Sequence, residues 1–372
     1  MSLNANVVRQ WVALQGGSCD LRIGQGAIDA MGNLLKSTVG KPRRCLLVAT
    51  DDLSPELVES VRRQLSDTGF EVSHLSLPLG PSLRTLASAE RLCEALAQAK
   101  VTADDLVCAI GASDLLSVCS FVCADWCGNT PLVHVATDLT SAIEMPATPR
   151  GIDVAGHEQM LSVHLGAKYV VCDLDVAAGE SSTPDAINLR AVMATSAICD
   201  GEAAVQRLWD RAELLVEGDL EIVRDQAADT AKSRGRIVSS AAIATRQSID
   251  FGQTFTRALS RLVGDDVPRG LLLAEAVRFQ ARIAAATDVM KVEDVLTIDE
   301  LLELLELPPV ACDVDPDEMV AALKNERFER SMRFVLCLPR GFGRVRPSSV
   351  EDEVLREHAQ AWSASRRALL GE

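Results

Sequence analysis

The sequence predicts an α/β protein, in which an N-terminal domain with a parallel, Rossmann-like sheet is followed by an all-α C-terminal domain. In the first half, short apolar segments alternate with segments of helical periodicity, which is typical of consecutive βαβ units. After Asp175, helical periodicity continues almost without interruption as far as one apolar segment at residues 334–338. This change places the domain boundary near residue 178 and gives two domains, residues 1–178 and 179–372.

The first strand and helix carry clear boundary signals. Residues 44–50 read R-C-L-L-V-A-T, a short apolar run that predicts a buried strand. The tripeptide Ser54-Pro55-Glu56 then supplies a helix cap, a first-turn proline and a first-turn acid. The helix is expected to run to about Asp67, where Thr68-Gly69 ends it.

The other elements of both domains follow from the same patterns. In the first domain, we expect a helix at residues 82–99 and strands at residues 70–77, 105–110, 132–136 and 169–172. In the second domain, we expect helices at residues 191–209, 219–244, 253–262, 270–287 and 298–305, a strand at 334–338, and a charged amphipathic helix at 350–370.

Composition excludes several classes of function. The 372 residues are 48% hydrophobic and 24% charged, which is ordinary for a globular protein with two cores. A net charge of −16 argues against binding to nucleic acid or to an anionic membrane surface. It leaves room for a small anionic ligand, because the charge of a pocket can oppose that of the whole protein.

The cysteines indicate a reducing compartment. There are eleven, an odd number spread along the chain, and no segment resembles a signal peptide or approaches the roughly 20 apolar residues that span a bilayer. We therefore expect a cytoplasmic protein with free thiols. Cys119, Cys123 and Cys127 would form one stripe on a helix, which is compatible with a soft metal; core packing is the more common use of such a stripe.

One segment carries a family resemblance. Residues 251–259 read F-G-Q-T-F-T-R-A-L, which resembles F-G-H-T-F-G-H-A-I, a signature of the 3-dehydroquinate synthase family. Phe251, Phe255 and Leu259 would form the packing face of this helix. Further blocks resemble the family in the same order: residues 78–84, 104–111, 130–137, 173–175 and 333–336.

The resemblance implies both an architecture and an activity. It implies an NAD-binding domain over residues 1–178 and a metal- and substrate-binding helical domain over 179–372. The family enzyme is a carbon–oxygen lyase of the shikimate pathway, which leads to the aromatic amino acids. NAD transiently oxidises a seven-carbon sugar acid phosphate, phosphate is eliminated and the ring closes, with zinc holding the substrate. Relatives tend to be dimers, and we expect a homodimer.

The positions of the three family metal ligands hold residues that cannot bind zinc. They fall on Ala191, Gln253 and Arg269, and the second histidine of the signature falls on Arg257. An amide oxygen is a poor zinc ligand and a guanidinium cannot be one. His134, His157 and His164 stand at none of these positions. We therefore predict that no metal is bound.

The NAD-binding turn is also altered. The family has G-G-G-V-x-G-D where this chain has G-A-S-D-L-L-S, residues 111–117. Only Gly111 remains of the glycines that let backbone amides approach pyrophosphate, and Asp114 adds negative charge. Gly111 and Asp104, which begins the block before the turn, are the remaining candidates for cofactor contact.

Basic residues at the substrate positions suggest an anion site. Arg150, Lys232, Arg257 and Arg269 are expected to face one cleft if the fold is kept. Such cations need balancing charge. Carboxylates within the protein are one solution, for which Glu144, Glu158 and Glu275 are candidates, and we favour it because buried charges are usually paired. An anionic small molecule, bound by Arg150, Arg257 and Arg269, is the other.

Three functions remain open. The first is a 3-dehydroquinate synthase with impaired or lost activity. The second is a non-catalytic homologue (a pseudoenzyme) that binds an anion or serves as partner of an intact paralogue. The third is a changed enzyme with Lys232 as acid or base. NAD and zinc are the cofactors that the resemblance implies, and the altered positions count against both.

Overall fold

The computed structural model describes residues 6–41, 43–148, 151–164, 166–264 and 266–371. The chain divides into two compact units, which are described separately. Unit 1 comprises Met1–Ala178 and Ala227–Gly235, and unit 2 comprises Gly179–Gln226 and Arg236–Glu372. Residues 227–235 therefore belong to the first unit, although the sequence analysis placed them in a continuous second domain.

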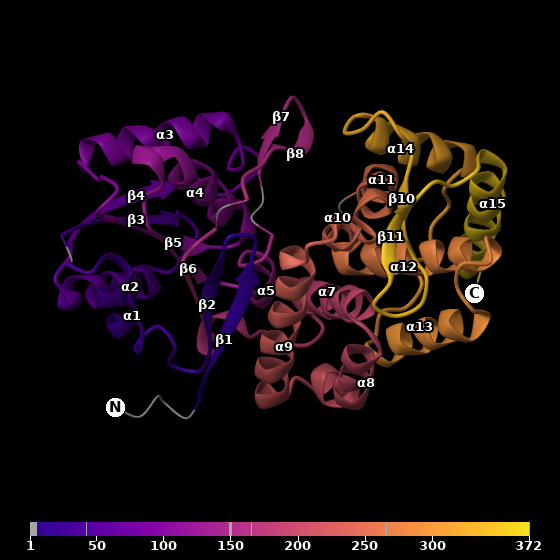
Figure 1. Ribbon diagram of the computed structural model, residues 1–372, viewed down its shortest axis with the longest axis horizontal. Coiled ribbons are helices and arrows are strands. Elements are labelled where there is room, and N and C mark those ends of the chain that lie inside the picture. Colours follow the sequence, from indigo (N-terminus) through magenta and orange to yellow (C-terminus); the bar gives the residue numbers. More distant parts are fainter. Residues whose placement is uncertain (1–5, 42, 149–150, 165, 265, 372) are drawn as a thin grey trace. The chain divides into compact units, whose positions relative to one another are not determined.

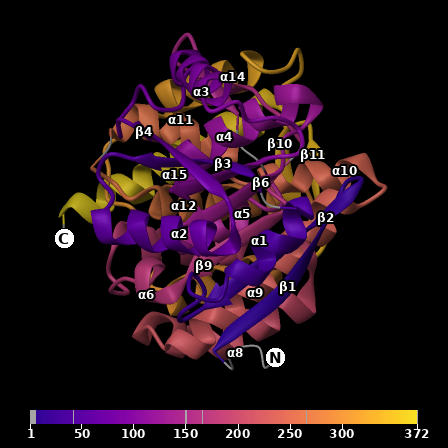
Figure 2. The same ribbon diagram turned by 90° about the vertical axis from the view of Figure 1, so that its left-hand side faces the viewer.

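Unit 1 is built on a seven-stranded sheet (Figures 1 and 2). The strand order is β1-β2-β9-β6-β5-β3-β4, and all neighbours are parallel except β1 and β2. The strands are β1 (Val7–Leu14), β2 (Gly17–Gly24), β3 (Arg44–Thr50), β4 (Glu71–Leu77), β5 (Leu106–Gly111), β6 (Leu132–Ala136) and β9 (Tyr169–Asp173). The central strands are continuous apolar runs because helices cover both faces of a parallel sheet.

The helices of unit 1 lie on both sides of this sheet (Figure 1). Helices α1 (Gly32–Val39) and α2 (Pro55–Thr68) pack on one face, with Met31, Leu35, Val61 and Leu65 in the core. Helices α3 (Leu86–Gln98) and α4 (Ser113–Asp125) lie on the other. The shorter elements are α5 (Leu139–Glu144), α6 (Leu174–Ala177), the 3₁₀ turn η1 (Trp126–Gly128) and a hairpin of β7 (Ile152–Val154) and β8 (His157–Leu161).

Unit 2 consists of helices and one two-stranded sheet. The sheet pairs β10 (Leu336–Pro339) with β11 (Val345–Ser348). The helices are α7 (Pro184–Asp200), α8 (Glu202–Glu217), α10 (Ile243–Gln247), α11 (Gln253–Val263), α12 (Arg269–Ala286), α13 (Val292–Leu304), α14 (Pro316–Phe328) and α15 (Asp352–Ala368), with 3₁₀ turns η2 (Ser248–Asp250) and η3 (Leu369–Gly371). Helix α9 (Leu220–Ser239) contributes residues to both units.

The predicted fold class is confirmed, and several boundaries are corrected. The predicted helix at 191–209 is wrong as one element, because Gly201 ends α7 and begins α8 with φ of 140°. The helix predicted to start at residue 82 starts at Leu86, and the helix predicted to run to residue 244 ends at Ser239. No helix in the described part of the chain is long and apolar enough to cross a membrane.

Candidate functional site

The structure brings two of the three predicted metal positions into contact. Gln253 is the first residue of α11, and Arg269 is the first residue of α12. The Nη2 atom of Arg269 donates a hydrogen bond to Oε1 of Gln253 at 3.3 Å. Two residues at the family's metal positions thus bind each other through a guanidinium and an amide.

Close helix packing brings the third position into the same region of unit 2. A Cβ at Gly270 would lie 2.6 Å from the Cα of Asn188 on α7, so the beginning of α12 touches α7 directly. Ala191 is buried one turn further along α7. A Cβ at Gly252, before α11, would lie 2.6 Å from Cδ1 of Leu273 on α12. Helices α7, α11 and α12 therefore meet at one junction within unit 2.

The side chains at this junction do not fit a metal. The three positions present a methyl group, an amide and a permanent cation, and a positively charged guanidinium repels zinc as well as failing to ligate it. Among the described residues, no group of three histidines, cysteines or acids is placed to hold a metal ion.

Helix α11 itself is packed as the sequence predicts. Phe251, Phe255 and Leu259 are all buried. The ring centroid of Phe255 lies 4.6 Å from that of Phe279 and 5.5 Å from that of Trp362, which it meets edge-on. The helix keeps its structural face while the residues at its metal positions have changed.

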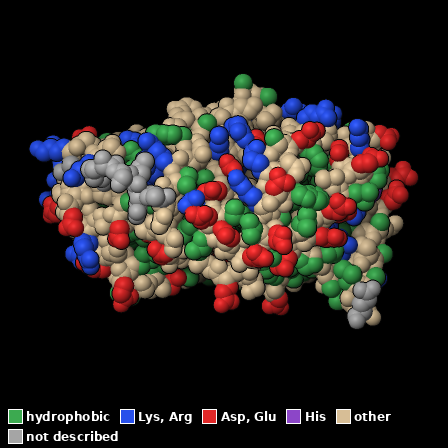
Figure 3. Space-filling model, turned by 90° about the horizontal axis from the view of Figure 1, so that it is seen from below, with side chains coloured by type: hydrophobic (Ala, Val, Ile, Leu, Met, Phe, Trp, Pro, Cys, Tyr) green, Lys and Arg blue, Asp and Glu red, His purple; other side chains and the backbone are tan. Residues whose placement is uncertain are grey.

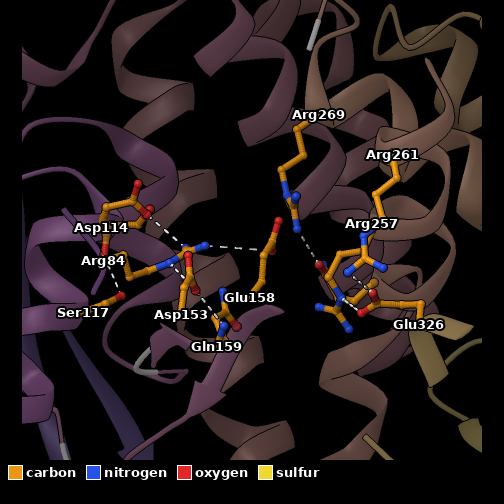
Figure 4. Close-up of polar contacts among 12 residues, drawn as sticks. Arg84, Asp114, Ser117, Asp153, Glu158, Gln159, Arg257, Arg261, Arg269 and Glu326 are labelled. Carbon is orange, nitrogen blue, oxygen red and sulfur yellow. Dashed lines mark hydrogen bonds and ion pairs between the residues drawn. The ribbon is translucent and has the colours of Figure 1, made fainter. Parts of the chain in front are cut away.

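Arg257 is held by a carboxylate of the protein. Its Nε binds Oε1 of Glu326, a fully buried residue of α14 (Figure 4). Arg261 and Arg330 each approach the same carboxylate at 3.0 Å, and Arg261 also lies 3.5 Å from Glu329. Three guanidinium groups thus surround one buried acid, and Arg257 belongs to an internal ion-pair network.

The three carboxylates predicted to balance the site arginines make other ion pairs. Glu144 lies 3.4 Å from Arg234, and Glu158 lies 4.0 Å from Arg84. Glu275 accepts hydrogen bonds from Arg366 at 2.8 Å, from Trp362 at 2.7 Å and from the backbone of Val310 at 2.9 Å. The acid that holds Arg257 is instead Glu326.

In unit 1, the turn after β5 is packed against the helix that follows it. Gly111 ends β5, and a Cβ there would lie 3.0 Å from Cδ2 of Leu115, so the glycine is used for packing. Helix α4 follows at once, and its first turn carries Asp114. A negative charge in a first helical turn competes with phosphate for the positive end of the helix dipole.

Arg84 connects this turn to the β7–β8 hairpin (Figure 4). Its guanidinium contacts Asp114 at 3.0 Å, Asp153 at 2.9 Å and Glu158 at 4.0 Å. Burial lowers the pKa of Arg84, but the hydrogen bond to Asp153 and the three negative charges together raise it above its ordinary value. One cation faces three carboxylates, so the region is negative overall and unfavourable for a pyrophosphate.

Two of the remaining predicted residues are exposed. Asp104 is exposed and precedes β5, whereas Gly111 ends it, so the two occupy opposite ends of one strand and cannot contact the same phosphate. Lys232 is an exposed residue of α9, within the part that belongs to unit 1. Arg150 lies outside the described residues.

The cysteine stripe and His134 have structural roles. Cys119 and Cys123 are buried in α4, whereas Cys127 follows the helix in η1 with φ of 50°, so the three thiols do not form one helical stripe. His134 is fully buried in β6, and its Nε2 lies 3.3 Å from Oγ of Ser120. Burial lowers the pKa of His134 to about 3, so the ring is neutral.

Sequence reasoning missed the roles of Arg84, Asp153 and Glu326. Arg84 carried a signal, because it ends the segment at residues 78–84 that resembles the family. Asp153 carried none, since its role depends on the hairpin of β7 and β8.

Curated proteins and solved structures resemble this chain over most of its length. No protein-family profile matches the chain. The curated relatives include the 3-dehydroquinate synthase of Symbiobacterium thermophilum, 22% identical over 333 residues that cover 88% of this chain and 91% of the relative. That of Dehalococcoides mccartyi strain CBDB1 is 21% identical, with coverage of 92% and 96%.

Solved structures agree with this fold. A 2-deoxy-scyllo-inosose synthase complexed with carbaglucose-6-phosphate, NAD+ and Co2+ matches with a TM-score of 0.80 at 13% identity, covering 95% of this chain and 100% of that one. ValA, a 2-epi-5-epi-valiolone synthase from Streptomyces hygroscopicus, matches with a TM-score of 0.76 at 17% identity, covering 95% and 99%. Both likenesses show that this chain shares the fold of these synthases.

Over 88–92% of its length, the chain is similar to curated 3-dehydroquinate synthases, which supports a place in that family.

Proposed function

We propose that this protein has lost the zinc- and NAD-dependent reaction of its family and binds a small anion beside Arg269. The observation that carries the proposal is the hydrogen bond between Arg269 and Gln253, at two positions where the family has metal ligands. With Ala191 at the third, there is no zinc to hold a substrate, and the positive charge of the site belongs to the protein itself.

An anion suits the chemistry of this junction. Arg269 and Gln253 each begin a helix, of 18 and 11 residues, so the positive ends of two helix dipoles meet there. A guanidinium has five N–H donors in a fixed plane, which matches the oxygens of phosphate and carboxylate. Because one structural neighbour was solved with a sugar phosphate analogue, we propose a phosphorylated or carboxylated polyol as the class of ligand.

Loss of NAD binding is supported independently by unit 1. Asp114 occupies the first turn of α4 and is paired with Arg84, which also engages Asp153. A dinucleotide would have to displace these ion pairs and place its pyrophosphate beside three carboxylates. We further propose a cytoplasmic location, supported by buried free thiols, and a role as a homodimer or as partner of an intact paralogue.

The test compares metal content, ligand stabilisation and turnover in purified protein. We expect no stoichiometric zinc, no change in Tm with NAD, no turnover of the family's substrate, and a rise in Tm of about 2–4 °C with phosphate or citrate. Arg269→Ala should abolish that rise, while Arg91→Ala, at an exposed residue of α3, should keep it. Stoichiometric zinc together with stabilisation by NAD would refute the loss of the reaction, and an unchanged rise in Arg269→Ala would refute the anion site.

A further inference from the structure

An exposed cluster of aromatic and basic residues follows α14 in unit 2. Phe328 is 51% exposed and Met332 is 96% exposed, and the ring of Phe334 lies 6.4 Å from that of Phe328. Arg327 and Arg333 join this cluster, since Nε of Arg327 donates to the backbone oxygen of Arg333 at 3.4 Å. We call these five residues the aromatic–arginine patch.

The patch is basic on a protein that is acidic overall. In the described part of the chain, neither Arg327 nor Arg333 forms an ion pair, whereas the nearby acid Glu329 lies 3.5 Å from Arg261. The net charge of the whole protein is −16. Exposed Met, Phe and Arg side chains together are typical of the centres of protein interfaces.

Helix α13 presents an exposed face that is aliphatic and acidic, whereas the patch is aromatic and basic. Val292, Leu296 and Leu304 are exposed at helical spacing, and Glu300 and Glu303 lie exposed on the same side. The other side of α13 is fixed in the core by Val295, Ile298, Leu301 and Leu302. Seen from below in Figure 3, hydrophobic and acidic side chains lie side by side over this part of unit 2.

The two surfaces lie at opposite edges of unit 2, with α14 at the top and α13 at the bottom in Figure 1. Within one chain the two surfaces cannot contact each other, but the patch of one chain can contact the α13 face of another. We propose that a second copy of this protein docks the exposed face of its α13 on the aromatic–arginine patch, forming a head-to-tail contact. This inference does not depend on the proposed anion site.

The chemistry of the two surfaces favours a second copy over other partners. Aliphatic side chains of α13 would bury the exposed Met332 and Phe328, and Glu300 and Glu303 would face Arg327 and Arg333. A head-to-tail contact leaves one patch and one α13 free at the ends, so it can add further copies.

Sedimentation velocity of the full-length protein at several concentrations tests the contact. Association should increase with concentration and weaken at high salt, because the ion pairs of an interface rim are screened. Arg333→Glu should weaken it by about ten-fold or more, and so should Glu300→Arg, since each places like charges together. Arg91→Glu and Glu94→Arg, at exposed residues of α3, are the matched controls and should leave it unchanged.

Mixing the two interface variants gives the decisive result. Arg333→Glu keeps an intact α13, and Glu300→Arg keeps an intact patch, so an equimolar mixture should form one-to-one pairs that cannot extend. Each variant alone should show no such species. The proposal is overturned if the wild type does not change its state with concentration, if the variants associate like the controls, or if the mixture forms no pairs.

Discussion

Glu326 and Arg269 show how charged and polar side chains are held near the predicted metal positions. Glu326 is fully buried and forms ion pairs with Arg257, Arg261 and Arg330, so the positive charge of these arginines is balanced within the protein. Arg269 donates a hydrogen bond to the amide oxygen of Gln253. We expect an added anion to bind Arg269 through the fixed plane of N–H donors of its guanidinium.

At the same scale, His134 predicts how stability depends on pH. Burial lowers its pKa from 6.5 to about 3, so below pH 6.5 the unfolded chain binds a proton that the folded protein does not. The stability that the neutral His134 ring contributes to the folded protein is therefore complete above pH 6.5 and is lost as the pH falls toward 3. At pH 5 the loss is about 2 kcal/mol.

His134→Gln tests this directly, since an amide does not titrate and can keep the bond to Ser120. The free energy of unfolding is measured in urea at pH 7 and at pH 5 for both proteins. Its decrease from pH 7 to pH 5 should be about 2 kcal/mol smaller in the variant than in the wild type. Equal losses in the two proteins would show that His134 does not titrate as described.

At the scale of elements, strands and helices were predictable where local signals and burial agree. Residues 44–50 form β3 as predicted, and Ser54 caps α2 by accepting from the backbone of Leu57. The hairpin of β1 and β2 was missed because burial does not follow one pattern in its strands: β2 is buried on both faces at its end, whereas Val12 is the one buried residue of β1. The ion pairs of Arg84 with Asp153 and of Glu326 with Arg257 were not predictable, since each joins residues far apart in the sequence.

The junction of α7 and α8 shows why one helix predicted at residues 191–209 is two. Periodicity continues through Gly201, but its φ of 140° and ψ of 178° end one helix and start the next. Gly201→Ala forces a side chain into this conformation and should cost about 1–3 kcal/mol. Gly179→Ala, at a glycine with ordinary φ and contacts no closer than 3.8 Å, should stay within about 0.5 kcal/mol. Urea unfolding measures both, and equal stability of the two variants would contradict the strain.

At the scale of the whole molecule, α9 is the element that the two units share. It runs without a break from Leu220 to Ser239, yet Ala227–Gly235 has its contacts within unit 1. Within unit 1, Gly235 lies against β1, where an added Cβ would be 2.8 Å from Cγ1 of Val12 and 2.9 Å from the backbone nitrogen of Ala13. A sequence-based boundary cannot anticipate this, because helical periodicity does not say which core a helix joins.

A helix shared in this way predicts that the units unfold together. Gly235→Ala should destabilise the protein by about 1–3 kcal/mol through overpacking against β1, although alanine is the better helix former. Gly32→Ala in α1, where the nearest atoms are flexible side-chain ends at 3.4 Å, should instead be neutral or stabilising.

Trp362, buried in unit 2, serves as a fluorescent probe in a variant that keeps it as its one tryptophan. The urea midpoints from far-UV circular dichroism and from Trp362 should fall together in Gly235→Ala, because α9 cannot leave one unit without disturbing the other. An unchanged Trp362 midpoint would show that the stability of unit 2 does not depend on the packing of α9 in unit 1.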